Sequence, residues 1–281
     1  MTITTLIENS REDDSSGLGI EHGVSLYLQA GGKNILFDTG QSDKFLKNAK
    51  SLGLSVADVE TLIISHGHFD HGGGLKYFFN ENSSAKVYLK KGAFGKIYAK
   101  HGIFKRYIGL DEALLDSYGD RFVHVTEKIE PLKNVFILPD IPDSHPRPAG
   151  NRVLFEKKGG RLVPDGFDHE LVVVIKEKDG IVVITGCSHR GILNMLEAAE
   201  REFPNEPIKA VLGGFHLMNP AQGVMAETEK TVRSIGKTLL QKKHVGMVYS
   251  GHCTGETPYD LLKEELGDKL DSFRTGKVIT L

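Results

Sequence analysis

The stretch 63-IISHGHFDHGGG-74 carries three histidines and one aspartate within the six positions from His66 to His71. A run at 59–64 that is rich in β-branched residues precedes the histidines, and three glycines follow them. That order predicts a buried strand that ends in a tight loop. Three imidazoles and a carboxylate on one loop are typical of a metal site rather than of a hydrophobic core.

The spacing within this loop divides the candidate ligands into two sets. His66 and His68 lie two residues apart, so their side chains point to the same side of an extended backbone. Asp70 and His71 follow a turn and can face a second point nearby. Such a division predicts two divalent metals roughly 3.5–4 Å apart. Imidazole and carboxylate suit zinc as well as manganese and iron, so the ligand types alone leave the metal open.

More histidines follow later predicted strands. Those after the strands 181–185, 208–212 and 245–249 are His189, His216 and His252. If neighbouring strands run in the same direction, the loops after them meet at one edge of a sheet, where α/β proteins usually bind their ligands. We therefore expect these histidines to join those of the opening stretch in a single site.

Composition and charge narrow the classes of function. Of the 281 residues, 40% are hydrophobic and 26% are charged, as in a globular protein with a substantial core. A net charge of −2 gives no reason to expect nucleic acid or an anionic membrane as a partner. The first ten residues lack a basic segment followed by an apolar one, and no apolar run reaches membrane-spanning length. We expect a cytoplasmic protein that acts on a small molecule.

Apolar strand-like runs and helical segments share the chain, which predicts an α/β protein built from layered sheets. The clearest element is the hairpin in 171-LVVVIKEKDGIVVIT-185, where Asp179-Gly180 supplies the turn. A single domain over 1–281 is expected, with an inserted subdomain or lid at about 85–140. Further strands are expected at 2–7, 25–29, 34–37 and 59–64, and helices at 42–51, 111–118, 192–203, 225–243 and 258–266.

Taken together, these motifs resemble the metallo-β-lactamase superfamily over nearly the whole chain. The segment 35-ILFDTG-40 resembles the family's early strand that ends in an aspartate, and 65-SHGHFDHGGG-74 resembles its central metal-binding signature. The resemblance implies an αββα sandwich of two sheets flanked by helices. The motifs 185-TGCSH-189, 213-GGFHL-217 and 252-HCTG-255 are similar to a narrower branch, the dihydropterin ribofuranosylaminobenzene phosphate synthase-like proteins.

The resemblance also implies roles for individual residues. It places Asp38 behind the metal loop, where it orients the ligands. The implied ligands are His66, His68 and His189 for the first metal, and Asp70, His71 and His252 for the second.

Two departures from the family pattern concern the later ligands. Hydrolytic members carry "TGD" where this chain has "TGC", so Cys187 takes the place of an aspartate that bridges the metals. Cys187 is then either a bridging thiolate or a small buried residue beside a metal that His189 reaches. The usual histidine loop before this strand is missing, although Asp168 and His169 lie near its expected place.

These assignments predict a binuclear metal-dependent hydrolase. Two cations that share a water would lower its pKa, supply hydroxide and stabilise charge on a phosphoryl or carbonyl oxygen. Asp70 would also steer the proton of that water. His216 would bind phosphate, act as a general acid or make a structural hydrogen bond. A phosphoester is the expected substrate, with Arg190 and the loop 144–152 as candidate anion contacts.

Two other functions stay open, a di-iron redox protein and a metal-dependent module that binds a pterin or a nucleotide. The formation of a homo-oligomer also stays open. Cys253, one residue past a candidate ligand, is expected to point into the core. The histidines expected to serve ordinary surface or packing roles are His22, His101, His124 and His244.

Overall fold

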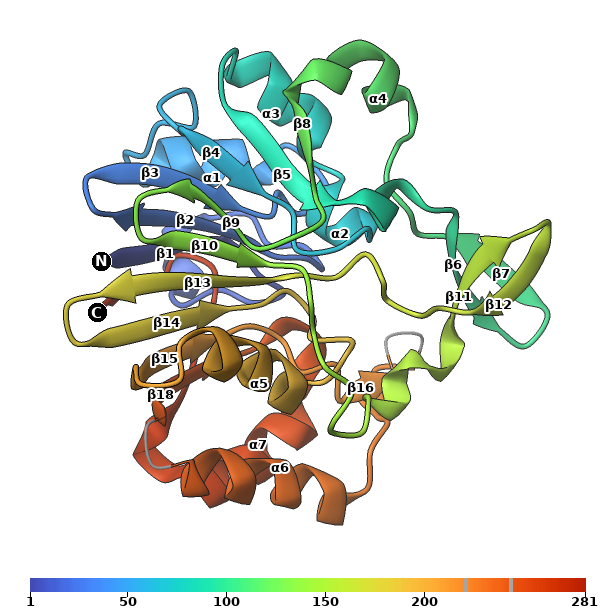
Figure 1. The fold of residues 1–281 in the computed structure, drawn as a ribbon, viewed down its shortest axis with the longest axis vertical. Helices are drawn as coiled ribbons and strands as arrows, with labels where there is room; N and C mark the ends of the chain where they lie inside the picture. Colours follow the sequence, from blue (N-terminus) through green and yellow to red (C-terminus); the bar gives the residue numbers. More distant parts are fainter. Residues whose placement is uncertain (220–221, 243–244) are drawn as a thin grey trace.

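The computed structural model describes residues 1–219, 222–242 and 245–281, without the side chain of His101. Within this part of the chain, two seven-stranded sheets pack face to face, and helices cover their outer faces (Figure 1). The predicted αββα sandwich is therefore confirmed. His244, for which an ordinary surface or packing role is predicted, lies outside the described residues.

The first sheet has the strand order β20-β1-β2-β3-β4-β5-β8. Its strands are β1 (Thr2–Ile7), β2 (Ser25–Ala30), β3 (Lys33–Phe37), β4 (Thr61–Ile63), β5 (Lys86–Lys90), β8 (Phe122–Val125) and β20 (Val278–Thr280). From β3 to β8 the neighbouring strands run parallel. The helices on this side of the molecule are α1 (Lys44–Ser51), α2 (Phe69–Gly72), α3 (Leu75–Glu81) and α4 (Ala113–Tyr118).

The second sheet has the strand order β19-β18-β15-β14-β13-β10-β9. Its strands are β9 (Ile129–Leu132), β10 (Val135–Leu138), β13 (Val172–Glu177), β14 (Gly180–Ile184), β15 (Ile208–Leu212), β18 (Val245–Ser250) and β19 (Leu270–Ser272). From β14 to β19 the strands run parallel. The helices on its outer face are α5 (Ile192–Glu202), α6 (Glu229–Gln241) and α7 (Glu256–Leu266).

The hairpin β13–β14 shows why its sequence is apolar on both faces. Val172, Val174 and Ile181 belong to the core beneath α5, α6 and α7. Val173 and Ile175 belong to the core between the two sheets. A strand that is covered on both faces needs a continuous apolar run rather than an alternating one. The predicted hairpin is confirmed, with Glu177 and Gly180 as its last pair.

Helix α6 is shorter than the predicted helix at 225–243. Its first turn is capped by Thr228, whose side-chain oxygen accepts a hydrogen bond from the backbone N–H of Thr231. Before this cap, Val224–Met225 form the short strand β17, which pairs with β16 (Met218–Asn219). A side-chain cap is a local signal, but the pairing of β16 with β17 is tertiary, and it takes Met225 from the predicted helix.

A third, four-stranded sheet with the order β12-β11-β6-β7 projects from one side of the sandwich (Figure 1). It pairs β6 (Ile97–His101) and β7 (Phe104–Tyr107) with β11 (Leu154–Lys158) and β12 (Arg161–Pro164). The predicted insertion at about 85–140 is distributed over three sheets, because β5 and β8 join the first and β9 and β10 join the second. That part of it acts as a lid stays a prediction.

The remaining helical elements are short 3-10 turns at Asp14–Ser16, Lys91–Phe94, Gly119–Arg121, Ala149–Val153, His252–Thr254 and Gly267–Lys269. As for membranes, no helix in the described ranges has both the length and the apolar character that a bilayer span requires.

The interior strand β15, which lies between β18 and β14, offers a test of the core between the sheets. Leu212 is fully buried there, so Leu212→Ala removes buried methyl groups and leaves a cavity. We expect a loss of about 2–5 kcal/mol in the free energy of unfolding, measured by urea denaturation of metal-loaded protein. The control Leu240→Ala, on the outer side of α6 with 43% exposure, should change it by about 0.5 kcal/mol or less. Equal effects of the two substitutions would contradict this packing.

Candidate metal centre

Loops from both main sheets meet at one edge of the sandwich. Parallel strands β3 and β4 deliver Asp38 and the histidine loop, and parallel strands β14, β15 and β18 deliver the later histidines. The side chains gathered there are His66, His68, Asp70, His71, Cys187, His189, His216, His252 and Cys253, and all of them are buried. The histidine-bearing loops thus meet at the ends of the strands, as predicted.

The first group of candidate ligands is His66, His68 and His189. Each offers one ligand atom, and these atoms lie within 4.8 Å of one another. Within the described ranges, the Nε2 atoms of His68 and His189 have no hydrogen-bond partner. A buried polar atom without a partner is costly, and a bound cation would satisfy several at once. The three histidines therefore fit a metal ion.

Burial keeps the imidazoles of this group neutral. It lowers the pKa of His66 well below its ordinary value, helped by the neighbouring His71. Burial together with the nearby His169 lowers the pKa of His68 to about 3. A neutral imidazole is the form that binds metal, so these side chains need to lose no proton to accept a cation at neutral pH.

The second group surrounds the Asp70 carboxylate. Its Oδ2 atom lies 3.7 Å from Nε2 of His71 and 3.4 Å from Nε2 of His252. The two imidazole Nε2 atoms are 3.3 Å apart. Carboxylate and imidazole atoms that meet this closely form a second candidate site, beside the first. The family resemblance implies the same three residues as ligands of one metal.

His22 also reaches this second group, although we expected an ordinary role for it. Its Nε2 atom lies 3.4 Å from Oδ2 of Asp70, and its ring centroid is 4.6 Å from that of His252. The next residue, Gly23, packs so closely that a Cβ atom there would meet the Asp70 carbonyl oxygen at 2.4 Å. His22 precedes β2, which is antiparallel to β3, so the start of β2 lies at the edge where β3 ends.

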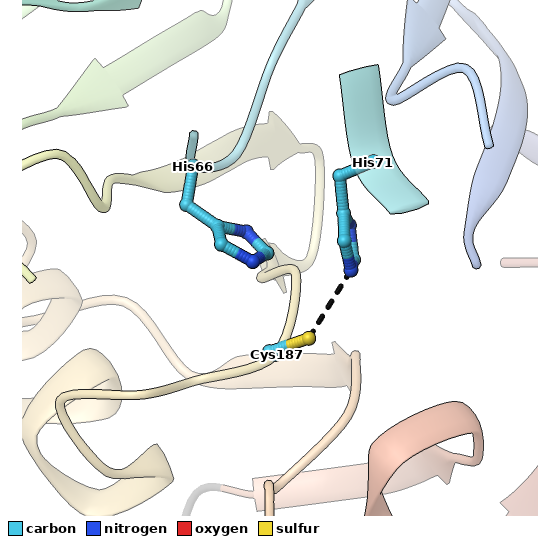
Figure 2. A group of neighbouring side chains, drawn as sticks. All are labelled: His66, His71 and Cys187. Carbon is cyan, nitrogen blue, oxygen red and sulfur yellow. Dashed lines mark hydrogen bonds between the residues drawn. The ribbon is translucent and has the colours of Figure 1, made fainter. Parts of the chain in front are cut away.

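Cys187 lies between the two groups. Its sulfur is 3.1 Å from Nε2 of His71, and the side chains of His66 and His71 both point toward it (Figure 2). Its sulfur also lies within 4.8 Å of ligand atoms of His189 and His216, and within 4.8 Å of a ligand atom of His252. Burial raises the pKa of the Cys187 thiol, so the free thiol is inert until a cation displaces its proton.

We expected Cys253 to point into the core, but its side chain faces the candidate site. Its sulfur and the ligand atoms of Cys187 and His252 lie within 4.8 Å of one another. The backbone turns sharply here, with Gly251 extended and His252 at φ 52. Because of this turn, two consecutive side chains face the same site.

Asp38 holds the metal loop from behind, as the resemblance implies. Oδ1 accepts a hydrogen bond from the Ser65 N–H at 2.8 Å, and Oδ2 accepts one from the Ser65 hydroxyl at 2.7 Å. Oδ2 is also 2.6 Å from Nδ1 of His71. Burial lowers the pKa of His71, but the carboxylates of Asp38 and Asp70 outweigh that effect and raise it to about 9.

His189 and His252, two of the candidate ligands, share a supporting arrangement that sequence reasoning missed. Nδ1 of His189 is 2.9 Å from the amide oxygen of Asn151, and Nδ1 of His252 is 3.0 Å from that of Asn9. An N–H donated to this oxygen leaves Nε2 free for a metal. The carboxylates of Glu170 and Glu8 accept the backbone N–H groups of the same two histidines, each at 2.7 Å. No local sequence motif predicts that these two asparagines and two glutamates contact the histidines.

His169 and Asp168 do not form the family's missing histidine loop. Nδ1 of His169 accepts a hydrogen bond from the Gly67 N–H at 3.0 Å, and Nε2 lies 3.2 Å from a carboxylate oxygen of Asp165. Both ring nitrogens are therefore engaged. The Asp168 side chain is 75% exposed. The structure brings His189 to the first group instead.

His216 stands beside the first group. It is 3% exposed, and its ring centroid lies 4.2 Å from that of His189. Neither of its ring nitrogens has a hydrogen-bond partner among the described residues. The site thus contains a buried imidazole with two free nitrogens, next to Cys187 and facing the cavity described below.

The arginines suggested as anion contacts are already paired. Arg190 donates a hydrogen bond to Asp143 at 2.7 Å and lies 3.5 Å from Asp168. In the loop 144–152, Arg147 donates two hydrogen bonds to the same Asp143 carboxylate. Both side chains are thus engaged by neighbouring carboxylates, and their contact with an anion stays a prediction. Among the histidines expected to serve ordinary surface or packing roles, His124 is exposed, in agreement with that expectation.

A cavity of about 300 Å³ opens above the centre. Its floor includes His68, Asp70, His189, His216 and His252, and its outer wall comes from the third sheet. This volume is at the small end of the range for small-molecule sites.

The model of the metallo-β-lactamase superfamily matches residues 18–191, more than half of the chain. The chain belongs to the metallo-β-lactamase superfamily. Over 277 residues it is 29% identical to the 7,8-dihydropterin-6-methyl-4-(β-D-ribofuranosyl)-aminobenzene-5'-phosphate synthase of Methanocaldococcus jannaschii, a match that covers 92% of this chain and 90% of that one. The predicted family and branch are therefore confirmed.

Solved structures agree with this membership. A crystal structure of Tm1679, a metal-dependent hydrolase of the β-lactamase superfamily, is 34% identical and superposes with a TM-score of 0.83, covering 100% of this chain and 99% of that one. Zn²⁺-bound PqqB from Methylobacterium extorquens has a TM-score of 0.61 at 10% identity, with both chains fully covered. The latter similarity concerns the fold alone.

The arrangement of His189 and His169 predicts different outcomes for their replacement. His189→Ala removes a free ligand nitrogen, so we expect about one metal ion per chain to be lost, as measured by elemental analysis. His169→Ala removes hydrogen bonds to Gly67 and Asp165 but no free nitrogen. The metal content should then be retained. The reverse pattern would show that His169 is the ligand.

The protonation of His71 predicts proton release on metal uptake. Its pKa of about 9 in the metal-free protein means that it is charged at about pH 7.5, whereas a ligand must be neutral. His68, with a pKa of about 3, has no proton to lose. Titration calorimetry in buffers of different ionisation enthalpy should count about one proton released through His71. That proton should be missing from the count for His71→Gln, and an unchanged count would contradict the assignment.

Proposed function

We propose that this chain is a binuclear metal-dependent hydrolase that acts on a phosphoester or a related bond of a small molecule. The observation that supports this best is the pair of buried ligand groups joined at Cys187. The similarity to a metal-dependent hydrolase over the full chain agrees with it. The phosphoester is suggested by the relative whose name includes a 5'-phosphate.

The residues proposed to hold the metals follow from the two groups. His66, His68 and His189 would bind one cation, and Asp70, His71 and His252 the other. Cys187, which approaches both groups, would be a further ligand as a thiolate. Nitrogen and sulfur ligands favour zinc, although manganese and iron remain alternatives. Two cations so bound supply a Lewis acid and a water of lowered pKa.

Asp70 and His216 are the proposed catalytic groups. Burial raises the pKa of Asp70, but His71 and its neighbours outweigh burial and hold the pKa well below the usual range. Asp70 therefore stays a carboxylate, which can accept a proton and orient a water molecule by hydrogen bonding. His216 has two free ring nitrogens at the cavity floor and can donate a proton to the leaving oxygen.

A second candidate is a bond-forming reaction at the same centre. Its support is the similarity over 92% of the chain to a protein named a synthase. In that case a group other than water would accept the transferred part of the substrate. Detection of a coupled product in place of a hydrolysed one distinguishes the two functions.

The central experiment measures metal content and turnover together. We expect about two ions per chain in freshly purified or reconstituted protein, together with hydrolysis of bis(4-nitrophenyl) phosphate or of a lactone. His68→Ala should lose one ion and about 100-fold or more of the activity. The control His124→Ala replaces an exposed histidine on β8 and should change neither.

Three results would overturn this proposal. Failure of the native protein to hold metal after reconstitution would remove the binuclear centre. Two iron ions with oxygen consumption would instead establish the di-iron redox function. Saturable binding of a pterin or nucleotide without product would favour a binding module.

A further inference from the structure

The chain contains two cysteines, and the fold brings them together. Cys187 follows β14 and Cys253 follows β18, and these strands lie on either side of β15. Both side chains are buried. Their sulfur atoms lie within 4.8 Å of each other and of a ligand atom of His252. Two thiols that are distant in the sequence therefore face each other at the metal centre.

The loop after β15 leaves the space that the Cys253 sulfur occupies. Gly214 lies in this loop, and its N–H donates a hydrogen bond to the Gly186 carbonyl oxygen at 2.8 Å. A Cβ atom at position 214 would lie 2.5 Å from the Cys253 sulfur, so a side chain there would displace that sulfur. The same sulfur lies 3.6 Å from the carbonyl oxygen of Cys187. The Cys253 side chain thus packs against Gly214 and reaches the main chain of Cys187.

The separation of the two sulfurs is within reach of a disulfide. A disulfide bond is about 2.0 Å long, so sulfurs within 4.8 Å have to approach by less than about 3 Å. Each sulfur ends a side chain that rotates about its Cα–Cβ bond between staggered positions. Such rotation at both residues can bring the sulfurs into contact while the strands stay in place.

The cavity over the centre gives a small oxidant access to both sulfurs. Cys187 and Cys253 line this cavity together with the ligand histidines, and its volume is about 300 Å³. Hydrogen peroxide is little larger than water, which occupies about 30 Å³ in the liquid. A peroxide molecule therefore fits in the cavity beside both thiols, although bulk solvent hardly touches them.

We propose that Cys187 and Cys253 form a reversible disulfide when the metal-free chain meets hydrogen peroxide, and that this bond prevents Cys187 from binding metal. The thiolate is the form of cysteine that binds a cation, and a sulfur within a disulfide is no longer a thiolate. Because Cys187 approaches both ligand groups, its loss should weaken metal binding. That consequence rests on the proposed function, which makes Cys187 a ligand, whereas formation of the disulfide does not.

The oxidation consumes one hydrogen peroxide and yields two waters. Burial raises the pKa of the Cys187 thiol, so Cys253 reacts with the peroxide first. Its sulfur bonds to one peroxide oxygen, the O–O bond breaks, and the thiol proton leaves with the other oxygen as water. The Cys187 sulfur then attacks the sulfenic sulfur of Cys253, the S–O bond breaks, and the Cys187 proton leaves with the hydroxide as a second water. Two electrons pass from the thiols to the peroxide, and a phosphine reductant reverses the bond.

The test is peroxide treatment of metal-free native protein, followed by thiol titration under denaturing conditions and by mass spectrometry of proteolytic peptides. We expect both thiols to disappear while the chain stays single on a non-reducing denaturing gel. The two cysteine peptides should appear as one linked pair, about 2 Da lighter than their sum. Phosphine reduction should restore both thiols.

Cys187→Ser and Cys253→Ser are the matched controls, because each retains a single thiol. That thiol lacks a partner in its own chain, so prolonged peroxide treatment should carry it to sulfinic acid, which the phosphine does not reverse. An equimolar mixture of the two variants holds both thiols in separate chains. The mixture should give no linked pair of chains, because the thiols meet within one fold.

Metal uptake tests the consequence of the disulfide. Oxidised native protein, freed of peroxide, should bind zinc at least about tenfold more weakly than the same protein after phosphine reduction, as measured with a competing chelator. Prior loading with zinc should in turn slow disulfide formation by about tenfold or more, because metal and disulfide draw on the same sulfur.

The outcomes separate this inference from the proposed function. Survival of both thiols, irreversible oxidation of both, or links between chains would overturn the disulfide. A disulfide that leaves zinc affinity unchanged would overturn the competition and remove Cys187 from the ligands. If reduced native protein binds no metal, the proposed hydrolase fails, and the peptide masses of the metal-free chain still decide whether the disulfide forms.

Discussion

A buried carboxylate at the end of β3 holds the metal loop in place. Asp38 is fully buried, with a backbone φ of 58, and it replaces lost water with hydrogen bonds to Ser65 and a contact with His71. These partners lie at the end of β4 and in α2, so one side chain fixes three neighbouring segments relative to each other. The direction of the ligand imidazoles depends on this arrangement.

The second sheet supplies the other half of the site in a similar way. Glu170 and Glu8 hold the backbone of His189 and His252, and asparagine amides orient the two rings. Each ligand group contains residues from both sheets, so neither group exists until the two sheets have packed together. Metal binding is therefore coupled to closure of the sandwich, and bound metal stabilises the folded state.

The surroundings of the centre are electrostatically uneven. Burial makes most ligand imidazoles neutral, while two carboxylates keep His71 charged in the absence of metal. On the opposite side of the cavity, Arg106 on β7 lies over the Phe69 ring and has no ion-pair partner among the described residues.

The sequence by itself determined the features that depend on near neighbours along the chain. Continuous apolar runs and Asp179-Gly180 predicted the β13–β14 hairpin, and the spacing of His66 to His71 predicted the ligand loop. The family followed from the same motifs. Only the tertiary structure decided that His22 approaches Asp70, that His169 is engaged by Gly67 and Asp165, and that distant segments form the third sheet. These contacts depend on strands that pair or pack across long stretches of chain, for which local periodicity carries no signal.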